Sequence, residues 1–139
     1  MATKTQTKLA IFIPAQETQG MPHGVSVVDL AEGTYGDVLA TMQFAVQGFI
    51  QPIDLAQEWE GYTLTSNEEA KLTYGMSYNP VATQIWQESF RGYAWGGDDY
   101  ILGNAILSLG VDSEGDFKGM TLEEAEELIL KIERSYTAY

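Results

Sequence analysis

The sequence of 139 residues contains no cysteine and a single histidine. Without cysteine there are no disulfide bonds, no thiolate nucleophile and no zinc or iron–sulfur site with cysteine ligands. The histidine, His23, lies in the loop-like stretch Met-Pro-His-Gly, and neither a Gly-x-Ser-x-Gly elbow nor a glycine-rich phosphate or dinucleotide motif is present. Serine-hydrolase catalysis, nucleotide hydrolysis and dinucleotide binding each depend on one of these motifs. The sequence therefore predicts a surface histidine, no catalytic residue, no metal site and no cofactor.

Basic residues are scarce as well. Seven Lys and Arg face 20 Asp and Glu, which gives a net charge of −13. Nucleic acid and anionic membranes repel such a chain, because binding to either depends on clustered Lys and Arg. We therefore expect no direct contact with nucleic acid or with a membrane.

Long apolar runs are missing too. The apolar run Leu9–Ile13 ends at Pro14. It is shorter than a signal-peptide core of about 7 residues or a membrane span of about 20. Together with the absence of cysteine, this predicts a cytoplasmic protein.

The sequence does contain enough apolar material for a core, at 45% hydrophobic and 12% aromatic residues. The hydrophobic patterns predict a flexible N-terminus over residues 1–8 and one compact α+β domain over residues 9–139. We expect about three helices and a mixed or antiparallel sheet of about four to six strands, with a long C-terminal helix packed on the sheet. The expected strands are residues 9–13, 25–30, 49–55, 58–65 and 98–110, and the expected helices are residues 34–47, 81–89 and 121–136.

Several residues predict local details. Pro52 places its strand at an edge or at a bulge, and Gly48 stands where the first helix would be capped. Thr121 and Glu124 have the spacing of a capping box. Two apolar stripes are expected to be buried, Val38, Leu39, Met42, Ala45 and Val46 in the first helix and Leu122, Ala125, Leu128, Ile129 and Ile132 in the last.

The acidic residues gather toward the C-terminus. Residues 98–139 hold ten acidic and three basic residues, a net −7. A helix N-terminus stabilises nearby carboxylates, which accounts for part of this pattern. The remaining excess suggests an acidic face that imitates nucleic acid, made of Asp112, Glu114, Asp116, Glu123, Glu124, Glu126 and Glu127. The first three and Glu123 match positions 1, 3, 5 and 12 of an EF-hand loop, but Phe117 stands where that loop requires glycine, so a solvated turn is the better interpretation.

An aromatic, glycine-rich stretch precedes the last predicted strand. Trp86, Phe90, Tyr93, Trp95 and Tyr100 have only Arg91 as a basic neighbour, which does not suit a single-strand stacking site. The aromatic residues either pack in the core or line a small-ligand pocket that an oligomer would complete. The candidate lining residues are Arg91, Tyr93, Trp95, Asp98, Asp99 and Tyr100. A further alternative is an enzyme that uses Asp98 and Asp99 as an acid–base pair.

Three motifs resemble one known family. They are Asn67-Glu-Glu-Ala-Lys-Leu72, Asn79-Pro-Val-Ala-Thr83 and the segment Asp99-Tyr-Ile-Leu-Gly-Asn104 that continues to an acidic turn at Asp116. They are similar, in this order, to the domain of unknown function 3846 family of phages, plasmids and actinobacteria, over about residues 34–130. Ala70 replaces a favoured glycine, and residues 87–97 are longer than in the family. The resemblance implies a small accessory protein of a mobile element and transfers no catalytic residue; Asn67, Asn79, Gly103 and Asn104 are expected to shape turns.

These features lead to two main hypotheses. The first is a non-enzymatic acidic binding protein of phage or mobile-element origin, acting in counter-defence in the host cytoplasm. It would mimic nucleic acid and inhibit a basic host protein that handles DNA or RNA. The second is a protein that sequesters a small signal molecule in the aromatic pocket, and it requires Arg91, Lys71 or Lys118 to converge if the ligand is an anionic nucleotide. A homo-oligomer is compatible with both.

Overall fold

The computed structural model describes residues 8–15, 24–32, 38–72, 75–93, 99–114 and 116–137. His23, Trp95 and Asp98 lie outside these residues. The secondary structure elements are β1 (Leu9–Ile13), β2 (Ser26–Asp29), η1 (Leu30–Glu32), α1 (Val38–Val46), β3 (Ile50–Asp54), η2 (Gln57–Trp59), β4 (Thr63–Asn67), η3 (Ala70–Leu72), α2 (Pro80–Ser89), β5 (Ala105–Ser108) and α3 (Leu122–Thr137).

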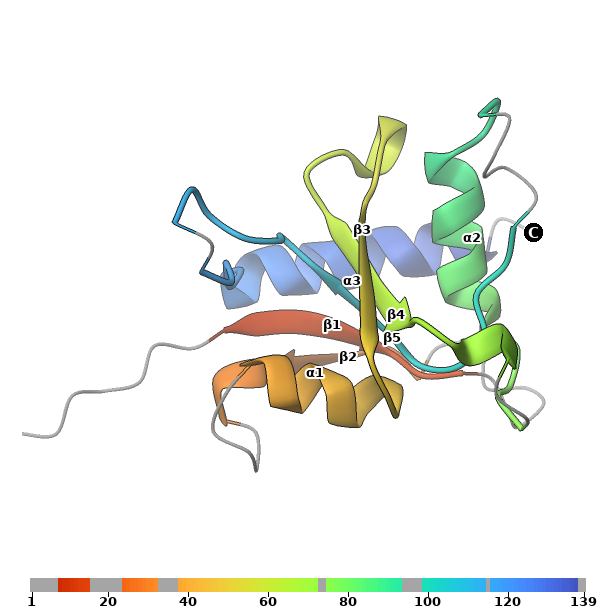
Figure 1. Cartoon of the computed structure of the whole chain (residues 1–139). Helices are drawn as coiled ribbons and strands as arrows, with labels where there is room; N and C mark the ends of the chain where they lie inside the picture. The colour runs from red at the N-terminus through yellow and green to blue at the C-terminus, as the bar shows by residue number, and fades with distance from the viewer. Residues whose placement is uncertain are drawn as a thin grey trace, which may run out of the picture.

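The five strands form one antiparallel sheet in the order β2-β1-β5-β4-β3. Helices cover both faces: α2 and α3 lie on one side and α1 on the other (Figure 1). The predicted α+β class and the C-terminal helix on the sheet are confirmed. Pro52 lies in β3, at the edge of the sheet as predicted. No helix among the described residues is both long and apolar enough to cross a membrane.

Side chains of the strands point alternately to the two faces of the sheet and contribute to two separate hydrophobic cores. In β5, Leu107 belongs to the larger cluster beneath α2 and α3, whereas its neighbour Ile106 belongs to the smaller cluster with Met42 and Val46 of α1. Successive side chains of a strand point to opposite faces, so one strand supplies both cores. Trp59 is fully buried in the larger cluster, and its indole donates a hydrogen bond of 3.1 Å to the carboxylate of Glu88 in α2.

The prediction for residues 58–65 was wrong. These residues begin with the turn of η2, and the strand starts only at Thr63 and continues to Asn67. All five residues of β4 are buried. The backbone of Gly61 has a φ of 94°, which is favourable only for glycine and turns the chain between η2 and β4.

Other boundaries also differ from the predictions. The last strand is only Ala105–Ser108, because the preceding residues make a turn at Gly103, whose φ is 79°. The left-handed residue after α1 is Gln47 rather than Gly48. Gly48 is needed for another reason, since a Cβ there would lie 2.6 Å from the side-chain nitrogen of Asn67. Two residues of the predicted buried stripes, Leu39 and Leu122, are 52% and 57% exposed.

Candidate functional site

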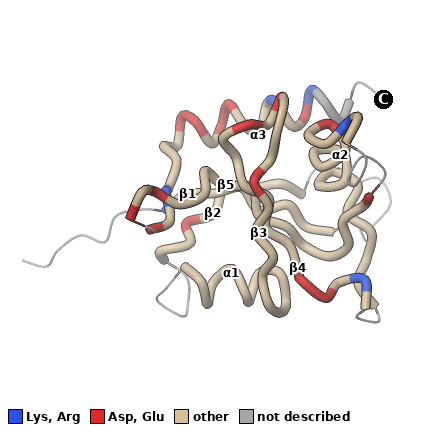
Figure 2. The backbone as a smooth tube through the Cα atoms, turned by 45° about the horizontal axis from the view of Figure 1, so that its top comes forward, with Lys and Arg blue, Asp and Glu red and all other residues tan. Residues whose placement is uncertain are grey.

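The first candidate site is the acidic surface, defined as Asp112, Glu114, Asp116, Glu123, Glu124, Glu126 and Glu127. All seven residues are exposed. Four lie on the first turns of α3 and three on the turn that precedes it, at the same end of the molecule (Figures 1 and 2). The structure therefore brings together the residues that the sequence assigned to one acidic face.

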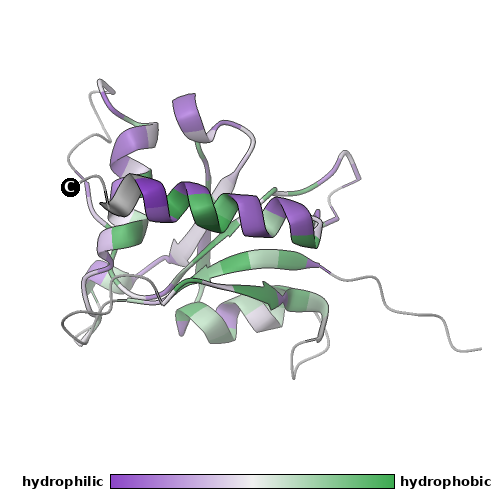
Figure 3. Cartoon of the chain, turned by 180° about the vertical axis from the view of Figure 1, so that it is seen from behind, coloured by the Kyte–Doolittle hydropathy of each residue, from purple (hydrophilic) through white to green (hydrophobic). Residues whose placement is uncertain are grey.

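The start of α3 holds its residues in place through a capping box. The amide of Glu124 donates to the hydroxyl of Thr121 at 3.0 Å, and the amide of Thr121 donates to the carboxylate of Glu124 at 2.9 Å. Hydrogen bonding of the Glu124 carboxylate with the backbone amide and with the side chain of Thr121 lowers the pKa of Glu124. The buried side of α3 presents Ala125, Leu128 and Ile132 to the core, and Figure 3 shows the resulting alternation of hydrophilic and hydrophobic residues along the helix. The outward side is left to the glutamates.

The turn before α3 is organised by Asp112. Its carboxylate accepts hydrogen bonds from the amides of Glu114, at 2.8 Å, and Asp116, at 3.0 Å. These two bonds lower the pKa of Asp112, with smaller contributions from the charges of Lys8 and Lys118. The Asp112 carboxylate is thus engaged by its own turn and is not presented as a free metal ligand. Within the described part of the chain, no three His, Cys, Asp or Glu side chains form a group that could hold a metal ion.

None of the seven carboxylates forms an ion pair among the described residues. Lys131, the nearest basic residue along α3, is engaged elsewhere: its ammonium group donates to the carbonyl of Glu58 at 2.7 Å and lies 4.1 Å from the ring centroid of Trp59. Within the described part of the chain, the negative charge of the acidic surface is therefore not neutralised by salt bridges.

The second candidate site is a pocket of about 170 Å³ near the β3–β4 edge of the sheet. Asp99 and Tyr100 line it, as the sequence predicted for an aromatic pocket. Arg91 and Tyr93 are not among its lining residues; Tyr93 instead packs against Phe90 with ring centroids 5.6 Å apart. Of the six predicted ligand-binding residues, the structure brings two together here, while Trp95 and Asp98 lie outside the described residues.

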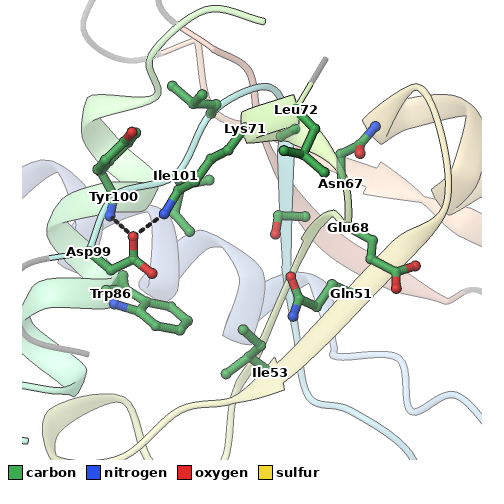
Figure 4. A pocket seen from close by; sticks show the side chains of 13 residues that line it. Gln51, Ile53, Asn67, Glu68, Lys71, Leu72, Trp86, Asp99, Tyr100 and Ile101 are labelled. Atoms are coloured by element: carbon green, nitrogen blue, oxygen red, sulfur yellow. Dashed lines mark hydrogen bonds and ion pairs between the residues drawn. The ribbon is translucent and has the colours of Figure 1, made fainter. Parts of the chain in front are cut away.

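The polar centre of the pocket is the ion pair of Lys71 and Asp99 (Figure 4). The Asp99 carboxylate also accepts the amide of Tyr100 at 2.8 Å, and the Lys71 ammonium group lies 4.3 Å from the ring centroid of Tyr100. Partial burial raises the pKa of Asp99, but the bonds from Lys71 and the Tyr100 amide, together with the Lys71 charge, outweigh burial and bring the pKa below its ordinary value. An aspartate held ionised in this way is poorly suited to donate a proton as a general acid.

Sequence reasoning named Lys71 and Trp86 as candidates but missed most of the other residues that line this pocket, among them Gln51, Ile53 and Glu68. They come from four separate segments that only the fold brings together. The available signal was the family motifs, because residues 67–72 and 99–102 of two motifs both contribute to the lining. Arg91 and Lys118 do not line it, so the basic residues that an anionic nucleotide would require do not converge there.

The asparagines of the motifs hold the backbone together, as expected. The buried Asn79 side chain donates to the carbonyls of Ile13 and Gly103, at 3.0 and 2.8 Å, and accepts the Ala82 amide that begins α2. Asn67 donates to the carbonyls of Val46 and Gln47, at 3.0 and 3.2 Å. Asn104 accepts the amide of Ala15 and donates to the carbonyl of Ala45. The motifs therefore build the framework around the pocket and connect it to α1.

Comparison with known proteins agrees with the motifs. The profile of the family described as Domain of unknown function (DUF3846) matches residues 17–133, well over half of the chain. The chain belongs to this family. No curated protein and no solved structure matches it. The DUF3846 match spans both candidate sites, the pocket and the acidic surface.

Proposed function

We propose that this DUF3846 protein is a non-enzymatic acidic binding protein whose target is a basic protein that handles DNA or RNA. The observation that supports this proposal is the acidic surface, whose exposed carboxylates form no ion pair among the described residues. A protein gains little stability from such a surface, because like charges on one face repel each other. A basic partner would supply the missing positive charge.

The charge on α3 suits an electrostatic mimic of nucleic acid. Glu123 and Glu127 are one helical turn apart, about 6 Å along the axis, which is wider than the rise of about 3.4 Å per phosphate along one DNA strand. The proposed likeness is therefore one of charge and not of matching intervals. A row of carboxylates can engage Lys and Arg side chains that otherwise contact phosphates, and electrostatic steering would make capture fast. The motif resemblance implies an accessory protein of a mobile element, so the setting we propose is counter-defence in the host cytoplasm.

Capture from a host lysate tests this proposal. The immobilised protein is expected to retain basic nucleic-acid-handling proteins at low ionic strength and to release them at moderate ionic strength or on addition of duplex DNA. Release by DNA is the decisive readout, because it shows that the acidic surface and the nucleic acid compete for one site. Retention that neither salt nor DNA changes would contradict the proposal.

A pair of triple variants localises the interaction. Glu123→Gln, Glu126→Gln and Glu127→Gln together remove three charges from α3 and should abolish capture. The matched control carries Glu58→Gln, Glu60→Gln and Glu68→Gln, three exposed glutamates outside the acidic surface, and should capture as the unmodified chain does. Equal capture by the two variants would mean that net charge, and not the acidic surface, attracts the partner.

A second function is favoured by the pocket at Lys71 and Asp99. Its volume of about 170 Å³ is below the roughly 300 Å³ at which drug-sized ligand pockets begin, so a small polar molecule is the ligand class we propose. Thermal unfolding in the presence of a panel of nucleotides and small metabolites tests it. A true ligand should raise the melting temperature of the native chain and of Lys118→Met, which changes a lysine outside the pocket, but not of Lys71→Met. If no compound shifts the native chain, the pocket is not a ligand site.

A further inference from the structure

Helix α1 covers the face of the sheet opposite α3. Helix α1 has no charged residue, and none occurs anywhere in residues 38–53. Surface helices usually turn charged or polar residues outward. Here Met42 and Val46 are buried, whereas Phe44 is 68% exposed and Phe49, just after the helix, is 66% exposed. Hydropathy colouring shows the same difference between α1 and α3 (Figure 3).

An apolar hollow of about 750 Å³ lies beside Phe44. Phe12, Val28 and Ala45 contribute apolar side chains to its lining, and Gln43 and Gln47 contribute polar but uncharged ones. The hollow and the exposed ring thus occupy the same patch. We call this patch, consisting of Phe44, Phe49 and the hollow, the neutral face.

We propose that the neutral face is the interface of a homodimer, in which Phe44 of each copy enters the hollow of the other. A two-fold axis pairs a surface with itself, so the patch must be self-complementary. A protruding aromatic ring beside a hollow on one patch meets that condition. Aromatic residues are also enriched, and charged residues depleted, at the centre of protein interfaces.

Charge identifies a second copy as the occupant. Two chains of net charge −13 repel each other, and contact through α3 would bring glutamates against glutamates. The neutral face is where such copies can meet without opposing carboxylates. A basic partner has no charge to pair with on this face and would be drawn to the acidic surface. Because α1 and α3 lie on opposite faces of the sheet (Figure 1), a dimer formed through α1 leaves both acidic surfaces open.

Sedimentation equilibrium of the full chain over a range of concentrations tests the dimer. The mass should approach twice 15.3 kDa, and association should strengthen as salt screens the repulsion between the copies. This salt dependence is opposite in sign to that proposed for the acidic surface, so the failure of one proposal is distinguishable from the failure of the other. A monomeric mass at every concentration and salt level would overturn the dimer.

Matched variants then locate the interface. Phe44→Glu adds a charge to the neutral face and should weaken association at least about tenfold, because it replaces an aromatic anchor by a buried unpaired carboxylate. Leu130→Glu adds the same charge at a leucine of α3 that is 49% exposed and should leave the affinity within about twofold. Equal weakening by the two variants, or none by Phe44→Glu, would place the interface elsewhere.

Distance measurement provides a readout independent of stability. Because the chain has no cysteine, Leu39→Cys and Glu126→Cys each accept a single nitroxide label. Leu39 is an exposed residue of α1 outside the lining of the hollow, and its label should show a short distance to its copy across the two-fold axis. The label at Glu126 should show a long distance or none. The reverse order would overturn the proposed interface.

Discussion

The two sides of the sheet differ in how polarity is arranged. On the α3 side, the interior is apolar and includes Trp59 and Trp86, while the outer surface of the helix carries glutamates. On the α1 side, β4 turns Thr63, Thr65 and Asn67 inward, and the outer surface of the helix exposes Phe44 and no charge. Relative to α3, the α1 layer is more polar inside and more apolar outside.

This difference suggests that one layer mainly stabilises the fold and that the other offers apolar surface to a partner. The larger core beneath α2 and α3 provides most of the apolar burial, which is the main favourable contribution to folding. The α1 layer has a smaller core, and part of its apolar area stays in solvent, where it becomes available to a partner. The net charge of −13 is therefore not evenly spread over the surface, since the glutamates of α3 and the neutral face lie on opposite sides of the sheet.

Truncation in the two cores should have the largest effects on stability. Leu128→Ala in the larger core should lower the free energy of unfolding by about 3 kcal/mol, because the closely packed surroundings cannot fill the cavity. Met42→Ala in the smaller core should cost less, about 2 kcal/mol, since neighbouring chains near the surface can relax. Urea unfolding measures both. A larger loss for Met42→Ala would contradict the ranking of the two cores.

A substitution inside the α1 layer should raise stability. Thr65 is fully buried, and its hydroxyl has no hydrogen-bond partner among the residues that the structure describes. Thr65→Val removes this unpaired group with little change in shape and should raise the free energy of unfolding by about 1 kcal/mol. Thr63→Val is the control on the same face of β4, because the Thr63 hydroxyl donates to Asp54 at 2.9 Å. The control should lose stability. If both variants gain stability, the effect of a buried hydroxyl in this layer does not depend on whether it has a hydrogen-bond partner.

The capping box of α3 should contribute to stability on the side of the sheet that carries the acidic residues of α3. Thr121→Ala should lower the free energy of unfolding by about 1 kcal/mol through loss of the N-cap. Glu124 has a lowered pKa in the folded state, so its contribution is present above the unfolded pKa near 4.5 and is lost as the pH falls through the lowered value. Thr121→Ala should reduce this loss at acid pH, as measured by urea unfolding at a series of pH values. Glu123→Gln, outside the capping box, should leave it unchanged.

Elements with strong local signals were predictable from the sequence. β1 ends where Pro14 follows, α2 begins with the Asn79-Pro80 cap, and α3 begins with its capping box; in each case neighbouring residues determine the conformation. β4 was not predictable in the same way. Its Thr-Leu-Thr-Ser-Asn sequence has no marked apolar alternation, and its burial results from the larger core on one face and α1 on the other.

The candidate sites show the same division. The acidic surface was predictable because its residues are close in sequence and lie on one helix and the turn before it. The pocket was not, because Gln51, Lys71 and Asp99 meet only after the sheet has formed. Phe44 was also missed as an exposed residue, since an apolar side chain in a helix is more often buried.

Leu122→Gln is expected to have the smallest effect. The stripe pattern of α3 predicts that Leu122 is buried, but the structure leaves it 57% exposed at the first turn. Loss of an exposed leucine should change the free energy of unfolding by less than about 0.5 kcal/mol, and the sedimentation mass should not change. Phe44→Gln, on the other layer, should have an equally small effect on unfolding of the monomer and yet weaken association. If Leu122→Gln weakens association as much as Phe44→Gln does, the two exposed apolar side chains are equivalent and the contrast between the layers does not hold.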